Sequence, residues 1–526
     1  MALIKFLCFF LVTGTIINSC KTKSKKVLAI PMEAATIQGN FSPQTLKVFD
    51  STVLVKFLDS FPRLAEIKNE LYSFYNGRNY AYAWFDENGM IEQAGNLFNR
   101  VKNISEEGLD TSSLVYQEDF NELMENHSES IDDAEIIFTE LMLSSQYLLY
   151  AKNVWHGLNE QKSLELQWLL PRKKISYVAT LDSLLSGKDL LENPPVYRQY
   201  YLLKEYLKKY KLAEAADTVL IIPVSSTYKK GDSSEVISKV RDKLFQLGDL
   251  DHNSGVYMFD ESLKVAVKTF QQRLGLNPTG IIKKAEIEEL NVPLHKRIEQ
   301  ILVNMERSRW VPQDVSNNYI LVNIPEFKLH VVENDSLLWS INVVVGKNQH
   351  KTVVFNGEIK YVVFSPYWNI PSSIMGNEIL PALRRNPNYL KTHNMEWNGN
   401  TIRQKPGPNN ALGLVKFLFP NSHSIYLHDS PAKSLFGETS RAFSHGCIRV
   451  EEPKKLAMYL LRNDGAWTEE KISAAMNAEK ERYVTLNQPL PVFIAYFTSW
   501  VDRAGKLNFR KDIYQRDDRL LQMIIN

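Results

Sequence analysis

The stretch His428–Val450 carries the side chains best suited to covalent chemistry. It contains Cys447, one of three cysteines in the chain. The other two, Cys8 and Cys20, lie in and at the end of an N-terminal apolar segment. If that segment is a signal, Cys447 is the only cysteine in the body of the mature protein. A lone cysteine outside the cytoplasm has no intramolecular disulfide partner and is open to oxidation. The sequence therefore singles out Cys447 as a candidate nucleophile.

Polar and flexible residues surround this cysteine. Gly446 permits a tight backbone approach, while Ser444 and His445 place polar groups at the same turn. Upstream, Ser-Ile-Tyr-Leu-His alternates as a strand does, so Tyr426 and His428 are expected on one face. A thiol nucleophile needs a base and donors for an oxyanion, and this cluster offers both.

The expected chemistry is acyl transfer through the sulfur. A free thiol has a pKa of about 8.5, so only a small fraction is thiolate at neutral pH. We expect His428 to accept the proton of Cys447, and the thiolate to attack an amide carbonyl. The backbone N–H groups of Gly446 and Cys447 are the candidate oxyanion donors. His445 is a second candidate base.

Two other interpretations use the same residues. A lone cysteine is usually a small buried apolar residue, and a lone histidine is usually structural. A metal site of His428, His445 and Cys447 lacks the paired spacing of zinc sites. We therefore expect neither a metal nor a cofactor.

Ser-His-Gly-Cys-Ile-Arg, with a histidine nineteen residues before the cysteine, resembles the signature of L,D-transpeptidases with a YkuD-type catalytic domain. The resemblance is closer to the large periplasmic form, which has a helical scaffold, a peptidoglycan-binding module and a capping subdomain. Three further stretches also resemble that form: Ser365–Ile374, Gln404–Gly413 and Val415–Asn421.

This resemblance implies roles for individual residues. Cys447 would be the acylated nucleophile and His428 its base. Arg449 stands where short relatives have asparagine and would bind a substrate carboxylate or shape the oxyanion site. Asp429 stands where short relatives have glycine. The cleft below the cap would include Tyr367, Trp368 and Asn409.

The resemblance also implies substrates. The donor would be a peptidoglycan tetrapeptide stem, cut between an L-configured centre and the terminal D-alanine. The acceptor would be a diaminopimelate amine on a neighbouring stem, which gives a 3-3 cross-link. Carbapenem β-lactams would acylate Cys447.

Three alternatives remain open from the sequence. A non-catalytic peptidoglycan-binding lipoprotein would leave the cysteine cluster unexplained. An L,D-carboxypeptidase or endopeptidase would use water as the acceptor, and attachment of an outer-membrane protein would use a lysine. The last two share the donor chemistry of the transpeptidase.

The N-terminus predicts attachment to a membrane. Residues 1–20 form an apolar segment that ends in Asn-Ser-Cys and resembles a lipoprotein signal peptide, with Cys20 as the lipid-bearing residue. The alternative is an uncleaved membrane anchor. Residues 21–40 begin with lysines and form a polar tether. We expect a membrane-anchored lipoprotein with its body in the periplasm.

The composition fits a multidomain α+β protein. With 526 residues, 44% hydrophobic and 23% charged, the chain can build several cores, and its net charge of +2 gives no case for nucleic-acid binding. In the predicted scaffold, an aromatic cluster of Tyr80, Tyr82, Trp84 and Phe85 is expected to be core. The predicted parts are a helical scaffold (41–226), a three-helix peptidoglycan-binding-like module (227–292), a connecting helix (293–317), a β-sandwich catalytic domain (318–500) with a helical capping insertion (about 373–407), and a C-terminal extension (501–526).

Overall fold

The structure is a computed structural model that describes residues 47–126, 132–187, 194–216, 221–224, 226–312 and 316–525. The predicted signal peptide, Cys20 and the predicted tether lie outside the described residues. Within the described ranges, no helix combines the length and apolarity needed to cross a bilayer.

The N-terminal part is helical, as predicted. Its central helix, α5, begins where the Asp132 carboxylate accepts the Glu135 N–H at 2.8 Å and caps the first turn. Tyr82, Trp84 and Phe85 are buried in the same core, which confirms that the aromatic cluster is structural. The elements are α1 (Ser51–Ser60), α2 (Lys68–Gly77), β1 (Phe85–Asp86), β2 (Gly89–Met90), α3 (Glu92–Lys102), α4 (Gln117–Glu125), α5 (Asp133–Tyr150), α6 (Glu160–Glu165), β3 (Trp168–Leu169), α7 (Tyr177–Leu185) and α8 (Arg198–Ala215).

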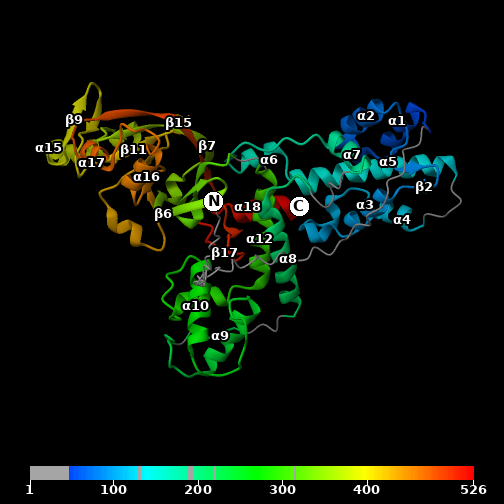
Figure 1. Cartoon of the computed structure of the whole chain (residues 1–526), viewed down its shortest axis with the longest axis horizontal. Helices are drawn as coiled ribbons and strands as arrows, with labels where there is room; N and C mark the ends of the chain where they lie inside the picture. Colours follow the sequence, from blue (N-terminus) through cyan, green and yellow to red (C-terminus); the bar gives the residue numbers. More distant parts are fainter. Residues whose placement is uncertain are drawn as a thin grey trace, which may run out of the picture. The chain divides into compact units, whose positions relative to one another are not determined.

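Three short helices follow within residues 227–292, where the sequence predicts a three-helix module. Asp260 caps the second by accepting the Leu263 N–H at 2.8 Å. A long helix then packs along α8 (Figure 1). These helices are α9 (Glu235–Gln246), α10 (Glu261–Arg273), α11 (Lys284–Leu290) and α12 (Leu294–Trp310).

The part of the chain after α12 is built on a ten-stranded sheet. Strand β11 pairs with both β12 and β7, so the sheet closes around one core, a closure that the predicted sandwich did not specify. The edge strand β3 comes from the N-terminal part and runs parallel to β7. The other strands are β4 (Tyr319–Asn323), β5 (Lys328–Glu333), β6 (Ser336–Gly346), β7 (Val354–Phe364), β11 (Val415–Leu418), β12 (Leu427–His428), β13 (Ala442–Ser444), β14 (Ile448–Val450) and β15 (Arg482–Ala495).

Two of these strands begin earlier than predicted. The alternating pattern of the sequence alone predicts strands that start at Ile359 and at Val492, whereas β7 and β15 start at Val354 and Arg482. In β15 the alternating pattern is hidden by Pro489 and by a register shift between Thr485 and Leu490.

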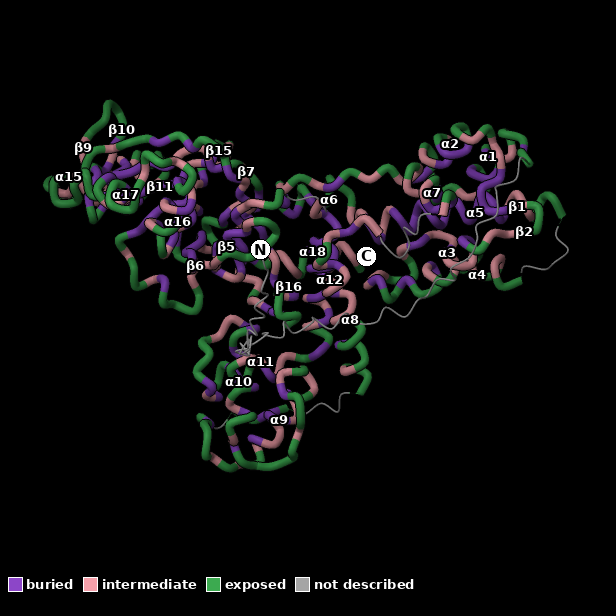
Figure 2. Tube along the Cα trace, in the orientation of Figure 1, coloured by how far each residue is buried: buried purple, intermediate pink, exposed green. Residues whose placement is uncertain are grey.

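Helices cover the sheet and share its core. Leu456, Ile472 and Leu520 belong to the same buried cluster as the strands. Figure 2 shows this buried interior in purple. The helices are α16 (Pro453–Leu460), α17 (Glu469–Met476) and α18 (Asp517–Ile525).

The capping insertion has its own small core of Ile370, Ile379 and Ile402. We predicted a helical insertion, but it also contains a three-stranded sheet in the order β8-β10-β9, and this corrects the prediction. The tight turn at Gly399, with φ of 60°, lets the chain reverse between two short strands. The elements are β8 (Trp368–Asn369), α13 (Ser372–Ile374), a π-helical turn (Met375–Ile379), α14 (Leu380–Arg385), α15 (Tyr389–Thr392), β9 (Met395–Asn398) and β10 (Thr401–Gln404).

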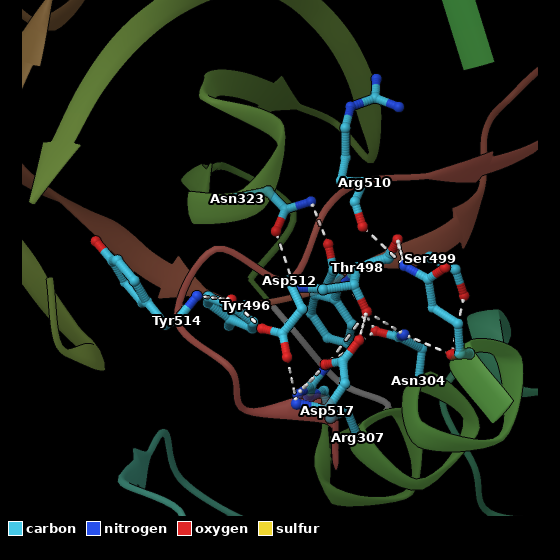
Figure 3. A network of polar contacts seen from close by, with 12 residues as sticks. Asn304, Arg307, Asn323, Tyr496, Thr498, Ser499, Arg510, Asp512, Tyr514 and Asp517 are labelled. Carbon is cyan, nitrogen blue, oxygen red and sulfur yellow. Dashed lines mark hydrogen bonds and ion pairs between the residues drawn. The ribbon is translucent and has the colours of Figure 1, made fainter. Parts of the chain in front are cut away.

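The segment after residue 500, expected as an extension, is bound firmly to the rest of the fold. It forms β16 (Ser499–Val501), β17 (Leu507–Phe509) and α18. Asn304 of α12 donates to Thr498 Oγ1 at 2.7 Å, and that hydroxyl donates to Asp517 at 2.6 Å (Figure 3). Asp517 also forms an ion pair with Arg307 at 2.8 Å.

Candidate active site

A single row of paired residues crosses the sheet and carries the polar side chains of the site. Tyr483 pairs with Val363, which pairs with Lys416; Lys416 pairs with His428, and His428 with Arg449. Residues paired in register point to the same face of a sheet. The next row, from Val484 to Ile448, lies in the core. The row with His428 therefore faces outward.

Cys447 lies one residue before β14, beside Tyr426, which lies one residue before β12. The Ile448 N–H donates to the Tyr426 carbonyl at 3.2 Å, which brings the two strands together at this point. The Cys447 thiol donates to the Ser424 carbonyl at 3.6 Å. Burial raises the pKa of the thiol, while hydrogen bonding with Tyr426 and the charge of Arg449 oppose that rise. The resting sulfur is therefore protonated.

His428 is buried, with 4% of its surface exposed. Its Nδ1–H donates to the Asp429 carbonyl at 2.5 Å, which leaves Nε2 as the basic nitrogen. Burial, followed by the charge of Arg449, lowers the pKa of His428 to about 4. The imidazole is therefore neutral near pH 7. Its ring centroid lies 5.7 Å from that of Tyr426, on the face that also carries Cys447. No hydrogen bond joins His428 to the thiol in the described part of the chain.

Asp429 fixes the backbone around His428. Its carboxylate accepts the Ser430 N–H at 2.7 Å, the Leu414 N–H at 2.9 Å and the Lys433 ammonium at 2.6 Å. A Cβ at Gly413 would lie 2.4 Å from this carboxylate, so only glycine fits there. Asp429 is thus a positioning residue in this structure.

The cysteine loop is tied internally by Ser444. Its hydroxyl donates to the Cys447 carbonyl at 2.5 Å and accepts the Gly446 N–H at 3.1 Å. The Gly446 N–H, predicted as an oxyanion donor, is therefore engaged in the loop. The N–H of Cys447 makes no hydrogen bond with the described residues and stays available.

Thr352 and Tyr514, which sequence reasoning did not identify, support the cysteine loop through hydrogen bonds. Thr352 Oγ1 donates to the Gly446 carbonyl at 2.8 Å and accepts the Gly346 N–H at 2.9 Å. Tyr514 donates to the Gly346 carbonyl at 2.6 Å and accepts the Thr352 N–H at 3.2 Å. The C-terminal segment therefore supports the cysteine loop indirectly. Tyr514 is hydrogen-bonded to Thr352, and Thr352 in turn is hydrogen-bonded to the Gly446 carbonyl.

Arg449 pairs with His428 across the two strands, and its guanidinium has a buried nitrogen without a hydrogen-bond acceptor in the described part of the chain. Its Nε is buried and meets no acceptor among the residues that the structure describes. The guanidinium also interacts electrostatically with Cys447. An unpaired guanidinium beside a nucleophile suits a carboxylate or a developing oxyanion.

His445 connects the cysteine loop to the cap. Its Nε2 lies 3.2 Å from the Glu378 carboxylate, in the π-helical turn of the insertion. Its ring packs on His350 with centroids 4.8 Å apart. Burial lowers the pKa of His445, and Glu378 opposes this shift. Its contacts among the described residues do not include the Cys447 thiol.

The predicted cleft residues lie at the root of the cap. The Tyr367 N–H donates to Glu481 at 3.0 Å, and Trp368 pairs with Gln404 in β8 and β10. Asn409 is exposed, and its backbone carbonyl accepts a hydrogen bond from the Gln404 side-chain amide at 3.2 Å. Sequence reasoning overlooked the adjacent Asn410, which is buried and donates to three backbone carbonyls, those of Pro366, Gln404 and Lys405.

No group of three or more His, Cys, Asp or Glu side chains is arranged to hold a metal ion within the described ranges. His428, His445 and Cys447 instead have the separate contacts given above.

Three family models match separate parts of the chain. Residues 317–471 match the L,D-transpeptidase catalytic domain, YkuD. Residues 69–207 match a model described as "Scaffold domain", and residues 233–288 match one described as "Putative peptidoglycan binding domain". The matches follow the order of the helical part, the three-helix module and the β-rich part.

A curated protein of Haemophilus influenzae, described as "Putative L,D-transpeptidase", is 33% identical over 249 residues. The match covers 43% of this chain and 50% of the relative, so the chain spans about half the length of the curated relative it matches.

Solved structures are more distant. An L,D-transpeptidase from Stackebrandtia nassauensis is 13% identical, with 51% of this chain and 94% of that chain covered and a TM-score of 0.23. L,D-transpeptidase 1 of Mycobacterium tuberculosis is 12% identical, with 34% and 61% covered and a TM-score of 0.17. Scores this low carry no argument. On these comparisons, separate regions of the chain are similar to an L,D-transpeptidase catalytic domain (YkuD), a scaffold domain and a peptidoglycan-binding domain, and the chain resembles the curated relative over half of that relative's length.

Proposed function

We propose that the protein is a cysteine-dependent L,D-transpeptidase that makes 3-3 cross-links in peptidoglycan. The observation that carries the proposal is the pairing of β12 with β14, which puts His428 and Cys447 on the same outward face of adjacent strands. Tyr426 lies against the thiol between them.

Acylation begins from a neutral thiol and a neutral imidazole. As Cys447 Sγ attacks the amide carbonyl between the L-centre and D-alanine, its proton passes to His428 Nε2. The Asp429 carbonyl, which accepts from Nδ1, supports the positive charge that then forms on the ring. The oxyanion is held by the Cys447 N–H and the Arg449 guanidinium. The imidazolium returns the proton to the leaving D-alanine amine, and a thioester remains.

The second half-reaction transfers the acyl group. A diaminopimelate amine of another stem attacks the thioester carbonyl, loses a proton to His428 Nε2, and expels the Cys447 thiolate, which takes that proton back. The cap contacts the cysteine loop through Glu378 and His445, and we propose that it limits the entry of water, which would hydrolyse the thioester. Carbapenems enter the same first step, because their strained amide acylates a thiol.

The proposed location rests on the sequence of the N-terminal segment. We propose that Cys20 carries lipid and anchors the protein to a membrane on the periplasmic side, within reach of the wall. The module at residues 233–288 would then bind peptidoglycan and bring the catalytic domain to its stems.

The test is incubation of the protein with purified tetrapeptide muropeptides, followed by mass analysis of the products. A dimer with loss of D-alanine supports transfer. Tripeptide alone indicates water as the acceptor and replaces the transpeptidase by a carboxypeptidase. No change in the substrate, together with wall binding, favours the non-catalytic alternative. A Cys447→Ala variant serves as the control for each product.

A further inference from the structure

A second histidine lies on the other side of Cys447 from His428. In the sheet, β14 lies between β12, which carries His428, and β6. The cysteine loop joins β13 to β14 near the end of β6, because both of these strands pair with β6. His445 lies in this loop, and its ring packs on His350, which follows β6. Since two residues span at most about 7 Å, the backbone of His445 lies within that distance of Cys447.

The His445 ring is accessible and lies next to a carboxylate of the cap. Its Nε2 lies 3.2 Å from Glu378 Oε1, which favours a proton on Nε2 and leaves Nδ1 as the basic nitrogen. Burial lowers the pKa of His445, and Glu378 opposes this shift. Lys347, His350 and Arg449 add to the lowering of the pKa. The imidazole is therefore neutral near pH 7, and 37% of its side chain is open to solvent.

The acceptor of the proposed reaction brings more protons than His428 can take. An aliphatic amine has a pKa of about 10.4, so at pH 7 it is an ammonium ion in all but about one molecule in 2,500. The ammonium has to lose one proton before its nitrogen can attack and a second proton during the attack. A neutral imidazole accepts only one proton. His428 takes the second and returns it to the Cys447 thiolate, so the first needs another acceptor.

We infer that His445, oriented by Glu378, takes this first proton from the acceptor ammonium. The inference rests on the proposed function, since it concerns the acceptor of that reaction. The ammonium is attracted to the Glu378 carboxylate and passes one proton to His445 Nδ1, which leaves a neutral amine beside the thioester. The amine then attacks, its second proton goes to His428, and the amide bond forms as the C–S bond breaks. His445 finally releases its proton to water.

The test follows transfer separately from acylation, in single turnovers of the full chain. A limiting amount of stem tetrapeptide acylates Cys447, and released D-alanine reports this step. Decay of the thioester, followed by intact-protein mass, reports transfer to one of two acceptors. The first is a stem tripeptide that ends in diaminopimelate, which is an ammonium ion at pH 7. The second is hydroxylamine, which is already neutral at pH 7 and has no need of His445.

The expected signature of His445 is a change in the pH profile. In wild type, transfer to the tripeptide should vary little from about pH 7 to about pH 9, because the ammonium ion and the neutral imidazole are the main forms throughout. In His445→Gln it should be at least about tenfold slower at pH 7 and rise about tenfold per pH unit, because only the rare neutral amine reacts. The reaction with hydroxylamine should not change.

Two further variants complete the test. Glu378→Gln should also slow transfer to the tripeptide, and in a His445→Gln background it should add no further loss, because both residues act on one proton. The matched control is His393→Gln, an exposed histidine of the cap that stacks on Tyr389, and it should behave as wild type.

The other outcomes separate this inference from the proposed function. Equal slowing of both acceptors in His445→Gln would come from displacement of the loop or the cap and would overturn the inference. Wild-type transfer, a flat pH profile or slower release of D-alanine in His445→Gln would overturn it as well. Absence of D-alanine release from the wild type, before any acceptor is added, overturns the proposed function instead.

Discussion

His428 pairs directly with Arg449 across the parallel β12–β14 ladder, so an imidazole and a guanidinium are nearest neighbours on the outward face. Lys416 pairs with His428 from the other side. The proposed base therefore has one cation beside it, Arg449, and it is also buried. Both features favour the neutral imidazole, which is the form that can accept a proton from Cys447.

The first prediction concerns the pH dependence of acylation. Burial and Arg449 lower the pKa of His428 to about 4, and protonation below that pH removes the base. The rate of carbapenem acylation should therefore fall as the pH drops through about 4 and vary little from there to neutral pH. Stopped-flow measurement of acylation checks this. An acidic limb near the ordinary histidine pKa of about 6.5 contradicts it.

The second prediction concerns Arg449. Its charge lowers the pKa of His428, so Arg449→Met should raise that pKa and move the acidic limb upward by about 1 unit. The same change should slow acylation, because the guanidinium no longer supports the oxyanion. The control is Arg462→Met, which removes an arginine paired with Glu333 at 2.6 Å. An unshifted limb in Arg449→Met shows that the guanidinium does not act on the imidazole.

The third prediction concerns Tyr426. Hydrogen bonding with its hydroxyl opposes the rise in the pKa of Cys447, so Tyr426→Phe should raise the thiol pKa further. The midpoint of iodoacetamide alkylation against pH should move to higher pH. Tyr459→Phe is the control, because that buried hydroxyl has no hydrogen-bond partner in the described residues. The same midpoint in all three proteins would exclude a role for Tyr426 at the sulfur.

The fourth prediction concerns Thr352. Thr352→Val removes the donor to the Gly446 carbonyl and the acceptor of the Gly346 N–H, both of them buried. We expect a loss of about 1–3 kcal/mol in the free energy of unfolding and slower acylation, because the cysteine loop loses its support. Thr269→Val, at an exposed hydroxyl that bonds only within α10, should change the stability by less than about 0.5 kcal/mol. Chemical denaturation measures both. Equal stability in the two variants would contradict the role given to Thr352.

Local patterns predicted most of the secondary structure and the residues that lie around Cys447. The alternating Ser-Ile-Tyr-Leu-His segment placed Tyr426 and His428 on one face, and the structure has both next to the cysteine strand. The predicted helical parts are present, and local contacts fix where their helices start: Asp260 caps α10 and Asp132 caps α5. These features depend on residues close together in the chain.

The remaining features depend on contacts between distant residues, for which a single sequence carries no periodic signal. Thr352 and Tyr514 meet Gly446 and Gly346 from segments far apart in the sequence. Strand β3 is two residues long, too short for a pattern, although it extends the catalytic sheet. The predicted Gly446 donor was plausible from its place in the loop, but the Ser444 hydroxyl already binds it.

The most direct test of the account is intact-protein mass spectrometry after incubation with a carbapenem, on wild type, Cys447→Ala and His428→Ala. We predict one carbapenem adduct on wild type, none on Cys447→Ala, and an adduct that forms at least about a hundredfold more slowly on His428→Ala. An adduct on Cys447→Ala, or wild-type acylation kinetics in His428→Ala, would contradict the assignment of nucleophile and base.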